Sequence, residues 1–187
     1  MAVGISGTHG NLTGQERTFH RDEIIVSKTD LKGCISYAND VFLRISGYSE
    51  AELLGRPHNI VRHPDMPRCV YKLLWSRIEA GNEIFAYVIN RAKNGDHYWV
   101  FAHVTPVFGV PDSGPDSGNR RTITGYHSSR RVPARPAVDA AVSLYAALRT
   151  EEARHADRNA AMAASGAMLE KLLRDKGTSY DEFILGL

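Results

Sequence analysis

The sequence has little cysteine, no long apolar run and almost no net charge. Only Cys34 and Cys69 are present, without a CxxC pair or zinc-type spacing, so a disulfide framework is excluded and a reducing compartment is favoured. A net charge of +2 does not indicate nucleic acid as a partner. The first 20 residues lack the pattern of a signal peptide, and no apolar run reaches membrane-spanning length. We therefore expect a cytoplasmic protein without membrane insertion.

Three segments differ in composition. Residues 1–20 are rich in Gly, Thr and Asn without periodicity, which predicts a flexible N-terminal arm. Residues 21–133 mix strand-like and helical patterns, and predict one α+β domain. Residues 137–187 are Ala-rich and helical, and predict a C-terminal helical extension. We expect this extension to pack either on the domain or against a second copy of the chain.

The domain follows the order of two strands, three helices and three strands. Two β-type runs flank the turn residues of TDLKG, and three short amphipathic segments follow, each ending near a glycine. Two longer alternating runs are joined by KNGD, whose Asn-Gly pair is typical of a hairpin turn. A last strand precedes Pro133. The repeated PDSG of residues 111–118 predicts an exposed loop, and the Arg pairs at 120–121 and 130–131 are expected to be solvated strand-end charges.

The segment HNIVRHPDMP, residues 58–67, is rich in chemically active side chains. A metal site is disfavoured because His58, His63 and Asp65 have no helical ligand spacing, and hydrolysis because no nucleophile elbow is present. A local ion pair between Arg62 and Asp65 is one alternative. The other is a rigid lip of a pocket, in which prolines stiffen the backbone and Arg62 and His63 donate to a large ligand while Asp65 orients one of them.

The strings AND.F..ISGY, EL.G.PHN.VRHPDMP and KNGDHYWV closely resemble PAS domains of the bacterial aerotaxis-receptor type. The resemblance covers about residues 24–132. It implies a five-stranded antiparallel sheet with helices over one face and a pocket between them. In aerotaxis receptors this pocket holds FAD, whose redox state reports on respiratory electron flow. The resemblance therefore implies a sensor, not an enzyme.

The resemblance also indicates site residues. We assign the predicted cofactor site to Asn39, Arg62, His63, Asp65, Ile84 and Tyr98. From the residues alone, Asn39 is equally a helix N-cap. The chain departs from the family pattern at Ile84, which stands where the family has a tryptophan associated with flavin binding. Isoleucine keeps apolar bulk but has no flat indole face.

Other PAS functions stay open as alternatives. His58 occupies the position of the reactive cysteine of light-sensing LOV domains, so covalent flavin photochemistry is not expected. A haem-binding gas sensor is possible because His58, His63, His97 and His103 are formal axial ligands. A cofactor-free interaction or dimerisation module is the remaining alternative, favoured by the apolar Ile84.

Our prediction is a free-standing cytoplasmic PAS sensor, because the residues after the domain are too few for a methyl-accepting signalling rod. It binds FAD, reports redox or oxygen status to a chemoreceptor or histidine kinase in trans, and forms a homodimer.

Overall fold

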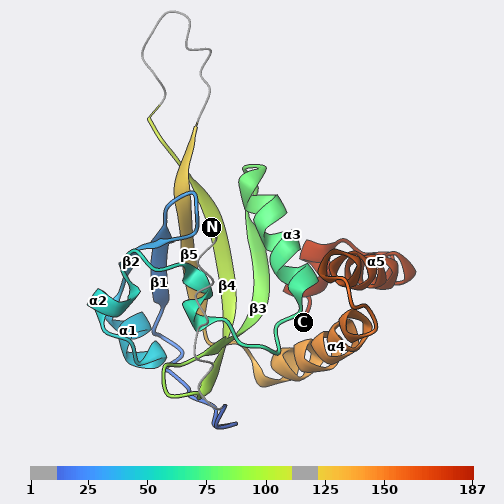
Figure 1. Ribbon diagram of the computed structural model, residues 1–187, viewed down its shortest axis with the longest axis horizontal. Helices are drawn as coiled ribbons and strands as arrows, with labels where there is room; N and C mark the ends of the chain where they lie inside the picture. Colours follow the sequence, from blue (N-terminus) through green and yellow to red (C-terminus); the bar gives the residue numbers. More distant parts are fainter. Residues whose placement is uncertain (1–11, 111–121) are drawn as a thin grey trace, which may run out of the picture.

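The computed structural model describes residues 12–110 and 122–187, so the predicted loop at 111–118 lies outside the described residues. Five strands form one antiparallel sheet in the order β2-β1-β5-β4-β3 (Figure 1). The strands are β1 (Ile25–Thr29), β2 (Ile35–Ala38), β3 (Ile84–Arg91), β4 (His97–Phe108) and β5 (Ile123–Arg131). The predicted five-stranded antiparallel sheet is confirmed, with the last strand inserted between the first and the fourth.

Short helices connect the two halves of the sheet. They are α1 (Asp40–Ser46), α2 (Glu50–Leu53), the 3₁₀ helix η1 (His58–Val61) and α3 (Arg68–Glu79). Gly47 ends α1 with a left-handed φ of 72°, a conformation that glycine adopts without steric cost. Figure 1 shows α1 and α2 beside β1 and β2, and α3 on the side of β3. The order of elements agrees with the prediction from the sequence.

The N-terminal segment differs from the prediction. Residues 12–20 are not a flexible arm, because the backbone N–H of Thr13 donates to the carbonyl of Gly95 at 3.1 Å and that of Arg17 to the carbonyl of His97 at 2.7 Å. Phe19 is buried in the core. The segment therefore lies along the β3–β4 hairpin, where backbone pairing outweighs its irregular composition. The first half of the predicted arm lies outside the described residues.

The C-terminal extension consists of α4 (Arg135–Ala153), α5 (Arg158–Lys176) and α6 (Tyr180–Leu185). It packs back on the domain, on the side of α3 and β3 (Figure 1). The Tyr145 hydroxyl of α4 donates to the Tyr87 carbonyl of β3 at 2.6 Å. The buried Glu152 accepts from the Cys69 N–H of α3 and the Ser165 hydroxyl of α5, both at 3.1 Å. Helix α4 is thereby joined to both neighbouring helices.

Along residues 12–110 and 122–187, no helix is both long enough and apolar enough to cross a membrane.

Gly125 tests the packing of the sheet, and Gly166 serves as its comparison. A Cβ at Gly125 of β5 would lie 2.3 Å from the Thr29 carbonyl oxygen, whereas a Cβ at Gly166 of α5 would meet nothing within 4 Å. We expect Gly125→Ala to lower the free energy of unfolding by about 2 kcal/mol or more, because the backbone of β1 must move. Gly166→Ala should raise it by about 0.5–1 kcal/mol through helix propensity. Urea denaturation measures both, and equal effects would contradict the close β1–β5 approach.

Candidate cofactor-binding site

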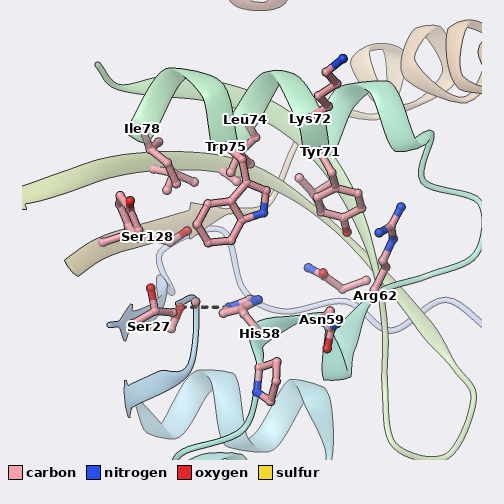
Figure 2. A pocket seen from close by; sticks show the side chains of 18 of the residues that line it. Ser27, His58, Asn59, Arg62, Tyr71, Lys72, Leu74, Trp75, Ile78 and Ser128 are labelled. Atoms are coloured by element: carbon pink, nitrogen blue, oxygen red, sulfur yellow. Dashed lines mark hydrogen bonds between the residues drawn. The ribbon is translucent and has the colours of Figure 1, made fainter. Parts of the chain in front are cut away.

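A cavity of about 390 Å³ lies between α3, η1 and the sheet (Figure 2). This volume falls in the range of small-molecule sites, roughly 300–1,000 Å³. Tyr71, Trp75 and Ile78 of α3 form one wall, at the i, i+4 and i+7 positions of one helix face. Val88 of β3 and Ala102 of β4 lie on the sheet face opposite. The walls are therefore mainly aromatic and apolar.

The charges on the cavity wall are of one sign. The lining contains the cationic side chains of Lys32, Arg62, Arg68, Lys72, Arg130 and Arg158. No carboxylate is among the described residues that line the cavity, and none of these cations forms an ion pair with a described carboxylate. Figure 2 shows the Lys72 side chain pointing away from the cavity. The other wall cations favour an anionic or strongly polar ligand.

Arg130 of β5 is the most buried of these cations, with 5% of its surface exposed. Its Nη2 donates to the Ser27 hydroxyl and to His58 Nε2, both at 2.7 Å, and its guanidinium lies 5.2 Å from the centre of the Phe42 ring. Burial lowers the pKa of Arg130 to about 10, so the group stays charged at neutral pH. Its Nε and Nη1 groups donate to no described side chain and are available to a ligand.

His58 is held in its neutral form beside this charge. Burial and the positive charge of Arg130 lower the pKa of His58 from 6.5 to about 3. Because Arg130 only donates, His58 Nε2 must accept and Nδ1 carries the proton. The Ser27 hydroxyl lies 3.2 Å from the same Nε2, as the dashed line in Figure 2 marks. The three side chains form a closed polar cluster at the cavity wall.

Two buried hydroxyls on the cavity side of the sheet lack a partner. The Ser128 hydroxyl of β5, which lines the cavity, and the Tyr98 hydroxyl of β4 make no hydrogen bond among the described residues. A buried hydroxyl without a partner costs roughly 1–3 kcal/mol. A polar ligand in the cavity would satisfy Ser128 directly.

Arg62 is the predicted site residue that lines the cavity. Its backbone bridges to Asn90 of β3, and its guanidinium lies 4.2 Å from the centre of the Tyr71 ring. The predicted alternative of an Arg62–Asp65 ion pair is not formed, because Asp65 pairs with Arg149 of α4 at 2.5 Å. Arg62 and Asp65 therefore serve different neighbours.

The structure does not bring the other predicted residues into the cavity wall. Asn39 bridges β1 and α1, accepting from the N–H groups of Val26 and Phe42 and donating to the carbonyl of Ile24. Buried His63 accepts from the Asp65 N–H at 3.1 Å. Ile84 and Tyr98 are fully buried, on the strand face that also carries Val88 and Ala102. None of these predicted residues is part of the cavity lining.

Most of the lining residues were not identified from the sequence, Arg130 and Trp75 among them. Arg130 was expected to be solvated, and this is wrong for Arg130 although Arg131 is exposed. Trp75 presents an indole to the cavity from α3 (Figure 2), so the flat aromatic surface missing at Ile84 is supplied by another element. The Tyr71–Trp75 pair at i, i+4 spacing was the available signal.

The histidines considered as haem ligands are dispersed. Only His58 of the four lines the cavity; His103 bonds Glu83 at 2.7 Å on the opposite sheet face, and the rings of His63 and His97 lie 5.9 Å apart outside the lining. Within residues 12–110 and 122–187, no group of three or more His, Cys, Asp or Glu residues is arranged to hold a metal ion.

Comparison with known proteins identifies relatives of this arrangement. The profile of the PAS fold matches residues 35–116. The aerotaxis receptor of Escherichia coli (strain K12) is 38% identical over 141 residues, which are 75% of this chain and 26% of the receptor. A nitrogen fixation regulatory protein of Klebsiella pneumoniae is 33% identical over 84 residues, 45% of this chain and 17% of that protein. The chain thus spans about a quarter or less of these relatives.

A solved structure of a light-oxygen-voltage domain studied with a flavin analogue has the same fold. Its TM-score is 0.50 at 17% identity, and the match covers 64% of this chain and 83% of that chain.

The neutral state of His58 predicts a pH dependence of stability. The unfolded chain binds a proton at His58 below about pH 6.5, but the folded protein does so only near pH 3, so the folded state is progressively disfavoured as the pH falls through this window. Between about pH 7 and pH 5 the free energy of unfolding of the wild type should fall by about 2 kcal/mol more than that of His58→Gln. The glutamine keeps an acceptor for Arg130 but does not titrate. Urea denaturation at each pH measures the difference. Parallel curves for the two proteins would show that His58 is not held neutral.

Proposed function

We propose that this chain is a PAS-type sensor that binds FAD in the cavity beneath α3 and reports redox or oxygen status. The observation that carries the proposal is Arg130, a buried guanidinium on the cavity wall with no carboxylate partner among the described residues. A charged donor that faces a cavity suits a heteroaromatic ring that carries carbonyl acceptors.

The other wall residues fit the same ligand. Tyr71 and Trp75 offer aromatic faces for packing against a flat ring, and the unpartnered Ser128 hydroxyl offers a hydrogen bond to its edge. The Arg62 guanidinium, stacked on Tyr71, lies where it could donate to a more distant part of the same ligand. These residues support a flavin more strongly than the sequence alone, in which Ile84 replaces the expected tryptophan.

FAD would supply a group that takes up and releases electrons. The chain's own residues respond to the resulting change of charge at the ring: Arg130 holds a fixed positive charge, and neutral His58 accepts from it at Nε2. If the ligand changed the hydrogen bonds that Arg130 donates to it, the bond from Arg130 to His58 would change as well. Because η1 carries His58, the position of η1 would then shift. The segment from Arg62 to Asp65 follows directly and would move with it.

The output of the sensor is also part of the proposal. We propose that it acts in the cytoplasm on a chemoreceptor or a histidine kinase in trans, as a homodimer. The similarity to an aerotaxis receptor supports a chemotaxis partner, although only 26% of that receptor is matched.

The two alternatives have less support. A cofactor-free interaction module would leave the buried Ser128 hydroxyl facing the cavity without a partner, at a cost in stability. Of the four histidines proposed as haem ligands only His58 lines the cavity, and its Nε2 already accepts from Arg130 at 2.7 Å. No comparable conflict arises for a flavin.

An absorption spectrum separates the three functions. We expect the purified chain, or the chain reconstituted with FAD, to show flavin absorption bands between the blue and the near ultraviolet. A Soret band would indicate haem, with His58→Ala removing it. A colourless protein that does not take up FAD would overturn the proposal and favour the interaction module.

Ser128→Ala tests the placement of the ligand with two readouts of opposite sign. The ligand-free variant should gain about 1 kcal/mol in free energy of unfolding, because an unpaired buried hydroxyl is removed, while its affinity for FAD should fall about fivefold. Ser129→Ala is the matched control, since the next residue of β5 faces the other side of the sheet. Unchanged FAD affinity in Ser128→Ala would show that the ring lies elsewhere.

A further inference from the structure

Three arginines gather at one end of the cavity. Arg62 follows η1, Arg68 begins α3, and Arg158 begins α5 of the C-terminal extension; all three line the cavity. Burial lowers the pKa of Arg62, and the nearby charges of Arg158 and Arg68 lower it further. Like charges held this close repel one another unless an anion lies between them.

Arg158 differs from the other arginines of the extension in its lack of an ion pair among the described residues. Arg149, Arg154 and Arg174 each pair with a carboxylate, whereas Arg158 forms no ion pair with any described carboxylate. The carboxylate of Glu152 contributes to the field at Arg62, but its Oε1 is already engaged by Cys69 and Ser165. Three positive charges at the cavity end are therefore only partly offset, by the single carboxylate of Glu152.

Helix α5 also takes part in the wall itself. Met162 lines the cavity one helical turn after Arg158, so the same face of α5 supplies a charged and an apolar contact. The Arg149–Asp65 ion pair joins the hairpin of α4 and α5 to the domain near these residues, because Asp65 follows Arg62 by three residues. The cavity and the docked extension thus share one border.

We infer that Arg158 of α5 completes a phosphate subsite with Arg62 and Arg68, so that the phosphate groups of the flavin nucleotide connect the PAS domain to the C-terminal extension. This inference rests on the proposed function. A ligand that contacts Arg158 only when α5 is docked stabilises the docked state, so binding and docking are linked. The extension is then part of the sensor's readout.

The experiment compares ligands that share the ring but differ in phosphate. Riboflavin, FMN and FAD are titrated into the full-length wild type, Arg158→Ala and the control Arg174→Ala, which removes an equal charge from the far end of α5. We expect Arg158→Ala to lower the affinity for FMN and FAD about five- to tenfold and to leave the affinity for riboflavin unchanged. This is the size of effect expected for the loss of one exposed charge-assisted contact. Added salt should weaken FAD more than riboflavin in the wild type.

Hydrogen exchange gives a second readout. FAD should slow the exchange of α5 amides in the wild type more than riboflavin does, and this excess should disappear in Arg158→Ala. A purely structural role of Arg158 would change α5 exchange equally with both ligands. Equal affinity of wild type and Arg158→Ala for FAD, or equal losses for riboflavin and FAD, would overturn the subsite while leaving flavin binding intact.

If the wild type binds none of the three flavins, the proposed function fails and the subsite is tested separately. Calorimetric titration with inorganic pyrophosphate then decides. Weaker binding by Arg158→Ala than by Arg174→Ala supports the subsite, and no binding by the wild type overturns it.

Discussion

A guanidinium buried without a carboxylate is the constraint on which this cavity depends. Desolvating an arginine costs several kcal/mol unless its donors are satisfied, and Arg130 meets that need with Ser27 of β1, His58 of η1 and the face of Phe42 in α1. The sheet order places β5 between β1 and β4, so this cluster lies near the middle of the sheet. Three elements from distant parts of the chain are positioned by one charge, and part of that charge still faces the cavity.

The elements themselves were predictable because their signals are local. The Asn94–Gly95 turn, the N-cap at Asn39 and the glycine after α1 act over a few residues, and the structure has each of them. Arg130 was not predictable in the same way. Strand alternation requires one member of the Arg130–Arg131 pair to face inward, but the pairing of Ser27 with Ser128 decides which one, and that contact is long-range.

In the segment from Arg62 to Asp65, too, local features were predictable and long-range contacts were not. Its composition and prolines indicated a rigid polar border of a pocket, and Arg62 does lie at the cavity. His63 accepts from the Asp65 N–H within the segment, and the Asp65 carboxylate pairs with Arg149 of the extension, which no motif of the domain describes. Likewise the aromatic wall comes from Trp75 on α3, an element that the family pattern at Ile84 of β3 does not describe.

The position of the extension also bears on how a signal leaves this domain. Helix α4 is held near its middle through Tyr145 and near its end through Glu152 and Arg149, and the last two residues contact Cys69 and Asp65. The segment after Arg62 is joined to the end of α4 by the Asp65–Arg149 ion pair, whereas Arg62 itself is bridged to Asn90 of β3. In the proposed sensor, the α4–α5 hairpin is the element best placed to convert a change of charge in the cavity into a change of surface, because packed helices shift between discrete arrangements instead of deforming continuously.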